Sequence, residues 1–371
     1  IKDIYLFMIS NPYGIDKKQK LDVDYLFIDG ISRSGKGGLA PLICSLKRVE
    51  HYKDNFNFDR TLPLLETGNL TLDGFRYFLE SDLLLDTWYM MMGRNMNMNK
   101  HDISSIENSF NPSRYKERLS TKDTPEIFDQ IKEHIKNEKL IFPYITEDMF
   151  TIASEHPEIF SGIKQIIVLR HPIETIFSWH RSKRGSRLGV DQRMPHPTFN
   201  YKEYQRLPSF TLARAEEYFN EDSLGKCVMA MTTLTNSYIK SLTKDDIKSK
   251  INFIGFDFDS FAINPQKGIE KIKDFLSTES SHFTSTALEM ARMPRKAKPD
   301  LFHSKTCAIF ANTSKHLHDE IIETCKKYES LFKECPYKLA DIRDLDLSSY
   351  EKIDFSELTP QPAYINGYRQ N

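Results

Sequence analysis

Residues 25–38 read Tyr25-Leu-Phe-Ile-Asp-Gly30-Ile-Ser-Arg-Ser-Gly35-Lys36-Gly37-Gly38, an apolar run that leads into a basic, glycine-rich loop. The run predicts a buried strand, and the residues from about Leu39 predict a helix. Closely spaced glycines let backbone N–H groups converge on an anion, and a helix start adds partial positive charge. We therefore expect a phosphate-binding loop made of Ser32, Arg33, Ser34, Gly35, Lys36, Gly37 and Gly38.

The spacing from Gly30 to Lys36 matches the G-x-x-x-x-G-K pattern of the phosphate loops of nucleoside triphosphatases. In those proteins a Ser or Thr follows the lysine and coordinates Mg²⁺, whereas this chain has Gly37 at that position. We expect a loop that binds phosphate without a metal ion. A glycine-rich turn that carries two cations by chance is the alternative interpretation.

A second segment, residues 163–180, is expected to bring an arginine and a hydroxyl to the same ligand. The apolar run from Ile163 predicts a strand that ends at Arg170, and Pro172 suits a helix start because its missing N–H costs nothing there. Ser178 follows about two turns into that helix. Open α/β sheets bind ligands at the carboxyl ends of their strands, and a guanidinium can bind phosphate through two hydrogen bonds. Arg170 and Ser178 are therefore predicted to bind one ligand together.

This Arg-x-Pro-x-x-x-x-x-Ser arrangement resembles the 3′-phosphate-binding element of sulfotransferases that use 3′-phosphoadenosine-5′-phosphosulfate (PAPS). In that family, a loop similar to Arg33-Ser34-Gly35 binds the 5′-phosphosulfate. Residues 251–276 also resemble the family's strand, acidic turn, Asn-Pro helix start and Ile-x-x-Phe-Leu packing helix. The resemblance covers these separate segments and their order along the chain.

The resemblance implies a single α/β domain over residues 1–371, with a P-loop-type three-layer fold around a central, mainly parallel sheet. It implies a helical insertion at about residues 68–136 that lines the acceptor site. The family also has a late basic loop with an Arg-Lys-Gly signature that folds over the 3′-phosphate. Arg295 and Lys296 occupy comparable positions, with Ala297 in place of the glycine, and are expected to bind the nucleotide.

Two departures from the family concern the chemistry of the site. Many relatives have a Thr-Thr pair after the loop glycine, where this chain has Lys36-Gly37, so that charge has to replace two hydroxyl donors. Relatives also commonly have a Lys-Thr-His or Lys-Thr-Pro strand before the arginine strand, and here residues 140–144 read Leu-Ile-Phe-Pro-Tyr. No histidine base can be carried over from that strand.

Sulfuryl transfer requires in-line placement of donor and acceptor, cations that stabilise the growing negative charge, and a base for the acceptor proton. Arg33 and Lys36 are predicted to be the catalytic cations. Several relatives place a glutamate base on the second strand, and the corresponding distance from the loop falls at Asp54. Regular strand alternation would put Glu50 on the same face as Asp54, whereas His51 would need a different register. Asp54 is therefore the first candidate for the base, and Glu50 and His51 are the alternatives.

The sequence as a whole predicts a sulfotransferase that uses PAPS, releases adenosine 3′,5′-bisphosphate, and needs no metal ion. Small-molecule, carbohydrate and lipid acceptors all stay open, and the transferred group could reach a hydroxyl or an amine. A P-loop kinase that uses Mg-ATP is one alternative, although Gly37 and Arg170 argue against it while Asp257 favours it. A catalytically silent nucleotide-binding scaffold is another, because the Thr pair is absent.

Composition sets limits on the remaining possibilities. The 371-residue chain is 39% hydrophobic and has a formal net charge of −1, so no global field attracts nucleic acid. Its five cysteines are scattered and contain no C-x-x-C pair, which favours neither a disulfide framework nor a zinc site. No apolar run is long enough to span a membrane. We expect a cytoplasmic protein, and the methionine-rich stretch after Met90 is a candidate surface for an oligomer.

Overall fold

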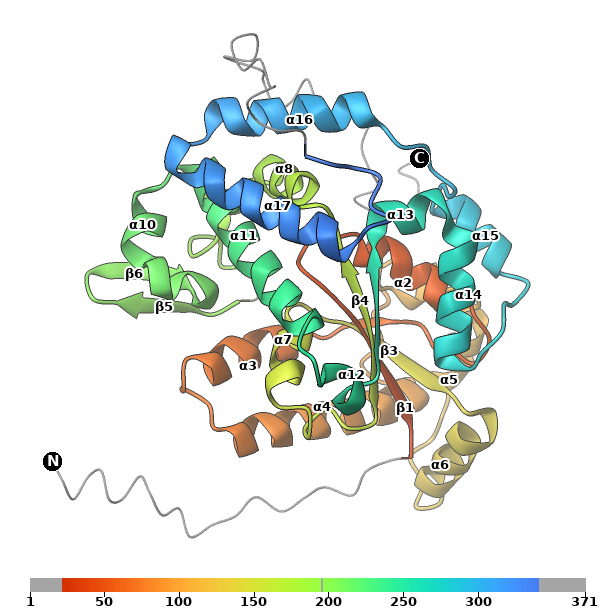
Figure 1. Ribbon diagram of the computed structural model, residues 1–371. Coiled ribbons are helices and arrows are strands. Elements are labelled where there is room, and N and C mark those ends of the chain that lie inside the picture. The colour runs from red at the N-terminus through yellow and green to blue at the C-terminus, as the bar shows by residue number, and fades with distance from the viewer. Residues whose placement is uncertain (1–21, 195, 340–371) are drawn as a thin grey trace, which may run out of the picture.

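The computed structural model describes residues 22–194 and 196–339, so both ends of the predicted domain lie outside the described residues. A five-stranded sheet with the strand order β2-β3-β1-β4-β7 forms its centre (Figure 1). Each neighbouring pair of strands in this sheet is parallel. Its strands are β1 (Asp24–Asp29), β2 (Lys53–Asp54), β3 (Ile141–Ile145), β4 (Ile163–Leu169) and β7 (Phe253–Asp257). The predicted central parallel sheet is confirmed.

Alternate side chains of the central strands pack into two separate hydrophobic clusters. In β1, Leu26 and Ile28 belong to one cluster and Phe27 to the other. In β4, Ile166 packs with the first of these clusters and Ile167 with the second. Because successive side chains of a strand point to opposite faces, each cluster covers one face of the sheet. The fold therefore has three layers, as predicted.

Helices cover both faces of the sheet (Figure 1). The smaller cluster contains side chains of α2 (Lys36–Cys44), α13 (Phe258–Ile263), α14 (Pro265–Leu276) and α15 (Thr284–Met290). The larger cluster contains side chains of α3 (Phe56–Glu66), α4 (Leu72–Met91), α7 (Met149–Glu155), α8 (Pro172–Arg181), α11 (Ser223–Leu242), α16 (Pro299–Asn312) and α17 (His318–Leu331).

Short elements complete the described part of the chain. They are the α-helices α5 (Pro112–Arg118), α6 (Ile127–Glu138), α9 (Arg184–Arg187), α10 (Ala215–Asn220) and α12 (Ile247–Lys250), the 3₁₀ helices η1 (Ile106–Asn108), η2 (Ser209–Arg214) and η3 (Lys315–Leu317), and the antiparallel strands β5 (Thr198–Tyr201) and β6 (Tyr204–Pro208). The β5–β6 hairpin lies beside α10, apart from the central sheet (Figure 1).

The local predictions differ from the structure mainly at two places. Helix α2 starts at Lys36, three residues before Leu39, so that Lys36, Gly37 and Gly38 form its first turn. The second strand is reduced to Lys53–Asp54, which pair with β3, and Val49 makes only an isolated bridge to Ile141. Regular alternation over residues 49–56 is therefore wrong. The chain turns irregularly there before α3 begins.

The connection from β2 to β3 is helical throughout its regular elements, which are α3, α4, η1, α5 and α6. The predicted insertion, at about residues 68–136, falls within this connection and places α4 and the segment after it beside β2. None of the helices in the described ranges is both long and apolar enough to cross a membrane. The five cysteines all lie within the described ranges, and none of them forms a disulfide there.

Candidate functional site

The loop between β1 and α2 depends on two glycines. Gly30 has a φ of 149°, and a Cβ atom there would lie 2.1 Å from the carbonyl oxygen of Val168. Gly35 has a φ of 105°, and a Cβ atom there would lie 2.3 Å from the Phe258 ring. Any side chain at either position is opposed by both the backbone conformation and a close contact. The first N–H groups of α2 lack partners within the helix, so they are available to an anion.

One buried hydroxyl in this loop is left without a partner. Ser34 is fully buried, and its Oγ makes no hydrogen bond within the described ranges. Ser32 is also buried, and its carbonyl accepts a hydrogen bond from Nε1 of Trp179 at 2.8 Å. Trp179 therefore supports the loop from α8. An unpaired buried hydroxyl costs free energy, which a bound phosphate oxygen would recover.

Lys36 folds back into the loop, and only 5% of it is exposed. Its Nζ donates to the Gly30 carbonyl at 2.6 Å and lies 3.4 Å from Oε1 of Glu147. Burial alone would raise the pKa of Glu147, but the charge of Lys36, with help from His196 and Arg184, lowers that pKa to about 2. The predicted phosphate-binding lysine is thus held by an ionised carboxylate that follows β3.

The two segments predicted to share a ligand meet through side chains. Nε of Arg33 donates to Oγ of Ser178 at 3.1 Å. Arg33 adopts a left-handed φ of 70° in the loop, and Ser178 lies on α8, the helix that follows the strand-end arginine. Ser178, eight residues after Arg170, therefore lies beside the loop that contains Arg33.

Positive charge is concentrated around Arg33. Partial loss of hydration lowers the pKa of its guanidinium, and the charges of Arg184, Arg181 and Arg170 lower that pKa further. Arg184 stacks over Trp179, with its Cζ 5.2 Å from the ring centroid. Within residues 22–194 and 196–339, no carboxylate forms an ion pair with Arg33, Arg181 or Arg184. Such an uncompensated cluster of guanidiniums is a suitable binding site for an anion.

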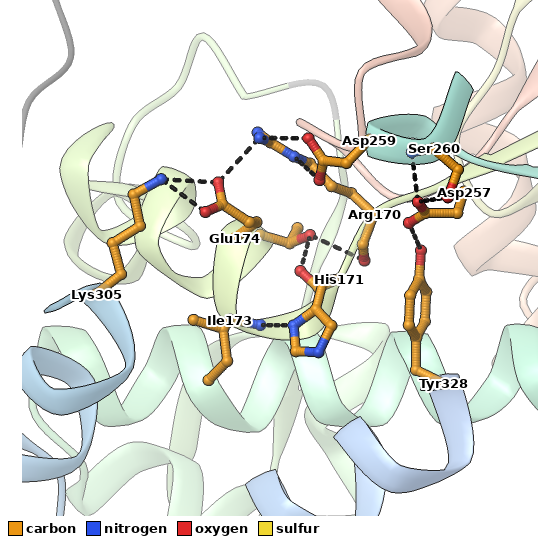
Figure 2. A network of polar contacts seen from close by, with 10 residues as sticks. Arg170, His171, Ile173, Glu174, Asp257, Asp259, Ser260, Lys305 and Tyr328 are labelled. Atoms are coloured by element: carbon orange, nitrogen blue, oxygen red, sulfur yellow. Dashed lines mark hydrogen bonds and ion pairs between the residues drawn. The ribbon is translucent and has the colours of Figure 1, made fainter. Parts of the chain in front are cut away.

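Arg170 is in a different situation, because carboxylates already occupy its guanidinium. Figure 2 shows it between Asp259 and Glu174. Its Nε and Nη2 donate to the two oxygens of Asp259 at 2.9 and 3.0 Å, and Nη2 lies 2.9 Å from Oε2 of Glu174. Glu174 in turn accepts from Nζ of Lys305 at 2.7 and 2.8 Å. The four groups carry two positive and two negative charges, so they form a neutral cluster, which we call the Arg170 cluster.

The charges of this cluster act on one another strongly. Burial would lower the pKa of Arg170, but Asp259 and Glu174 raise it overall. Burial raises the pKa of Asp259 despite the opposing charge of Arg170. An anion could bind the Nε and Nη2 edge of Arg170 only by exchanging with Asp259, since that carboxylate makes both hydrogen bonds there.

Arg295 of the predicted late basic loop and Arg170 both lie over the ring of Phe258. The guanidinium carbons of Arg170 and Arg295 lie 5.6 and 5.3 Å from the centroid of Phe258. Nη2 of Arg295 donates to the Ala291 carbonyl at 3.0 Å. Lys296 follows as an exposed residue. The Phe258 ring thus brings Arg295 toward Arg170 and toward Gly35 of the phosphate loop.

A cavity of about 390 Å³ lies between the β2 region and the predicted insertion. Its lining includes His51 and Asp54 on one side and Met90, Asn97 and Asp102 on the other. Burial raises the pKa of Asp54 to about 6, the charge of Asp102 adds to that shift, and the charge of Lys36 opposes it. The first-choice base therefore lies in a cavity, within electrostatic reach of the phosphate loop.

The two alternative bases, Glu50 and His51, lie in different environments. Glu50 is fully buried, and Arg118 donates to both of its oxygens at 3.0 and 3.1 Å. Arg114 approaches it at 2.6 Å, and the two arginines lower the pKa of Glu50 although burial would raise it. His51 lines the cavity together with Asp54, since the strand is irregular there, and burial lowers its pKa to about 4. Glu50 is held in the interior by arginines, while His51 faces the cavity as a neutral ring.

The segment around Ile103 lies between the cavity and the loop after β1, because its neighbours Asp102 and Ser104 line the cavity and Ile103 itself lies near Gly37. A Cβ atom at Gly37 would lie 3.6 Å from Cδ1 of Ile103, which is an ordinary van der Waals separation. The hydroxyl of Tyr52 donates to the Ile103 carbonyl at 2.5 Å and fixes this segment to the β2 region. The loop around Ile103 therefore separates the cavity from the first turn of α2 and lies against both.

Comparison with solved structures identifies three sulfotransferase domains or enzymes to which the chain is similar. The chain is similar to solved sulfotransferase domains. The domain from an olefin synthase of Synechococcus PCC 7002 has a TM-score of 0.42 and 12% identity, covering 88% of this chain and 100% of that one. The domain from the curacin biosynthetic pathway has a TM-score of 0.37 and 12% identity over 75% and 82% of the two chains. A sulfotransferase from Mycobacterium avium has a TM-score of 0.35 and 11% identity over 91% and 82%.

No family model and no curated protein matches the sequence. The roles of individual residues therefore rest on their contacts alone.

Several residues of the site were missed by the sequence reasoning. Glu147 follows β3 directly, and a polar residue at the carboxyl end of a buried strand is the signal that could have identified it. Asp259 and Glu174 gave no comparable signal, because their pairing with Arg170 depends on the meeting of α13 and α8. Asp257, which favoured a kinase, accepts hydrogen bonds from Ser260 and from the Tyr328 hydroxyl, the latter at 2.6 Å.

No group of three or more His, Cys, Asp or Glu side chains suited to a metal ion occurs within the described residues.

Proposed function

We propose that this protein is a sulfotransferase that moves a sulfonate group from PAPS to an acceptor hydroxyl or amine by in-line transfer. The observation that carries the proposal is the hydrogen bond between Arg33 and Ser178. It joins the phosphate loop to the helix that follows the strand-end arginine, and a cavity containing Asp54 adjoins that loop.

The residues of the site fit a nucleotide with two phosphate groups. Ser34 has a buried hydroxyl without a partner in the described ranges, and Arg33, Arg181 and Arg184 form no ion pair there. Ser32 to Gly38 would hold the 5′-phosphosulfate through backbone N–H groups and the charges of Arg33 and Lys36. Ser178, Arg170, Arg295 and Lys296 are the proposed partners of the 3′-phosphate. The donor supplies a sulfonate that is already activated by its bond to phosphate.

Asp54 is the proposed base. The acceptor oxygen or nitrogen loses its proton to the Asp54 carboxylate and bonds to sulfur, while the bond between sulfur and the phosphate oxygen breaks and leaves its electron pair on that phosphate. A base with a pKa of about 6 is ionised at neutral pH and still accepts a proton readily. Arg33 and Lys36 stabilise the negative charge that collects on the departing phosphate.

One observation favours a nucleotide-binding scaffold without transfer activity. Asp259 and Glu174 occupy Nε and Nη2 of Arg170, so that edge of the guanidinium is closed to a 3′-phosphate as long as the Arg170 cluster persists. The two proposals differ in the step after nucleotide binding. A scaffold would bind adenosine 3′,5′-bisphosphate and transfer nothing.

The first test is calorimetric titration of the protein with adenosine 3′,5′-bisphosphate and, in parallel, with Mg-ATP. We expect metal-independent binding of the bisphosphate that is lost in Arg33→Ala and retained in Arg76→Ala, a matched change on α4. Preference for Mg-ATP would point to a kinase, and failure to bind either ligand would refute the donor site. Transfer of radiolabelled sulfonate from PAPS to an acceptor mixture then separates an enzyme from a scaffold.

A further inference from the structure

Most of the side chains that line the cavity beside Asp54 are polar. Among the residues that line it, only Met90, Met96 and Ile106 have apolar side chains. Tyr52 is its one aromatic residue apart from His51, and that tyrosine is fully buried with its hydroxyl bonded to the Ile103 carbonyl. A steroid or a phenol would need a broad apolar or aromatic wall, which this cavity does not offer.

The charges of the lining disfavour ionic acceptors. Lys53 lies 2.9 Å from Asp86, so these two residues largely neutralise each other. Asp54 and Asp102 lie close enough for the charge of Asp102 to raise the pKa of Asp54, and Arg60 is exposed. An anionic acceptor would be repelled at the position where Asp54 acts. An amine would be held as ammonium between two carboxylates and would have no lone pair with which to attack sulfur.

Hydrogen-bonding groups of both kinds face the cavity. The side chains of Asn55, Asn57, Asn95 and Asn97 supply amide donors and carbonyl acceptors. His51 is 6% exposed, and its buried Nε2 has no hydrogen-bond partner in the described part of the chain. Because burial lowers the pKa of His51 to about 4, the ring is neutral at physiological pH and suits a hydroxyl partner.

We propose that this cavity binds a neutral, polyhydroxylated acceptor, a sugar or a sugar-like polyol, with one hydroxyl on Asp54 and a second on His51. The inference rests on the proposed sulfotransferase function, whose acceptor it specifies. The volume of about 390 Å³ lies at the small end of the range for small-molecule sites, roughly 300–1,000 Å³. A monosaccharide unit fits that size, and each of its hydroxyls can both donate and accept.

The test measures acceptor binding directly, without transfer. Saturation-transfer NMR on the full chain would use methyl glycosides of glucose, galactose and mannose, with 2-naphthol, tyramine and glucuronate as the phenolic, cationic and anionic probes. Each probe would be measured with and without adenosine 3′,5′-bisphosphate. We expect at least one neutral glycoside to bind, with at least about tenfold higher affinity than the other three probes.

Variants locate the binding in the cavity. His51→Phe keeps a planar ring but removes both nitrogens, and should weaken glycoside binding at least about fivefold. His51→Gln restores a donor and an acceptor and should recover part of that loss. His134→Phe makes the same change on an exposed face of α6 outside the cavity and should have no effect. Bisphosphate affinity, measured by calorimetry, should be the same in all of these variants.

The outcomes separate this inference from the proposed function. If naphthol, tyramine or glucuronate binds in preference to every glycoside, or if no probe binds, the polyol proposal is wrong, while bisphosphate binding would leave the donor site intact. If the bisphosphate fails to bind, the sulfotransferase proposal falls, and the glycoside result still stands because NMR detects it without nucleotide. Should His51→Phe fail to fold, the selectivity of the wild-type protein decides the question.

Discussion

Replacing Asp259 by asparagine should tighten the binding of nucleotides that carry a 3′-phosphate. In the wild-type protein, Asp259 makes two hydrogen bonds to Arg170, at 2.9 and 3.0 Å. A 3′-phosphate has to displace this carboxylate before it can bind the Nε and Nη2 edge of the guanidinium. The asparagine keeps one acceptor oxygen but loses the charge and the second oxygen, so it competes less well.

The size of the effect depends on the bonds that are lost. A hydrogen bond between charged groups contributes ~1.5–3 kcal/mol, and loss of one such bond from the competing partner is worth roughly a ten- to hundredfold gain in affinity. Glu174 still lies 2.9 Å from Nη2 in the variant, so the gain should fall in the lower half of that range. Asp259→Asn leaves Arg170 paired with Glu174, whereas Arg170→Ala would remove the arginine to which Asp259 is bonded.

The assay compares adenosine 3′,5′-bisphosphate with adenosine 5′-monophosphate by calorimetry. Only the first nucleotide carries the 3′-phosphate, so Asp259→Asn should change its affinity and leave that of the second unchanged. Asp123→Asn is the matched control, because Asp123 forms an exposed pair with Arg94 at 2.9 Å. Unchanged or weaker bisphosphate binding would refute the reasoning, and equal tightening of both nucleotides would show that the gain does not come from the 3′-phosphate.

Three further predictions concern the loop and the base. Asp54→Asn should leave bisphosphate affinity unchanged and lower the rate of transfer about 10²- to 10⁴-fold. The wild-type rate should fall as the pH drops through about 6, where Asp54 becomes protonated. A wild-type rate that does not change over this pH range would exclude Asp54 as the base. Folding raises the pKa of Asp54 from 3.8 to about 6, so the folded protein binds this proton more tightly than the unfolded chain does. The free energy of unfolding therefore falls as the pH rises from about 4 to about 6, and it stays at the lower value above that range. Asp54→Asn should therefore raise the free energy of unfolding at neutral pH by up to about 3 kcal/mol and have little effect near pH 4, which urea titrations at the two pH values would check. Gly35→Ala should weaken bisphosphate binding at least about tenfold, because the new Cβ would lie 2.3 Å from the Phe258 ring. Gly37→Ala should not weaken it, because its Cβ would lie 3.6 Å from Cδ1 of Ile103. Similar losses of affinity in both variants would contradict this account of the loop.

The architecture could be predicted because the signals that encode it are local. Apolar runs that end in Gly30 and in Arg170 mark β1 and β4, and Pro172 marks the start of α8. Arg33 lies in the loop after β1 and Ser178 lies on α8, the helix after the neighbouring parallel strand β4, and the two residues meet although the sequence predicted no contact between them. A motif that combines a strand end with a helix start constrains the geometry of its side chains.

The environment of the same residues could not be predicted, because it depends on contacts between distant segments. The Arg170 cluster joins side chains of α8, α13 and α16, and no spacing along the chain indicates that Asp259 will reach Arg170. The two-residue length of β2 likewise reflects its position at the edge of the sheet, where only β3 pairs with it. That irregular stretch is what allows both His51 and Asp54 to line the cavity, against the alternation expected of a longer strand.

The contact between Ile103 and the Gly37 position gives the two halves of the site a common wall. A ligand that orders this wall from one side spares part of the ordering cost for a ligand on the other side. Thermodynamic linkage then requires reciprocity: whatever factor the nucleotide contributes to the affinity for the acceptor, the acceptor contributes to the affinity for the nucleotide. Gly37 follows Lys36 in the place of a Mg²⁺ ligand. The coupling between the affinities of the two sites would then also depend on the packing of Ile103 near this glycine.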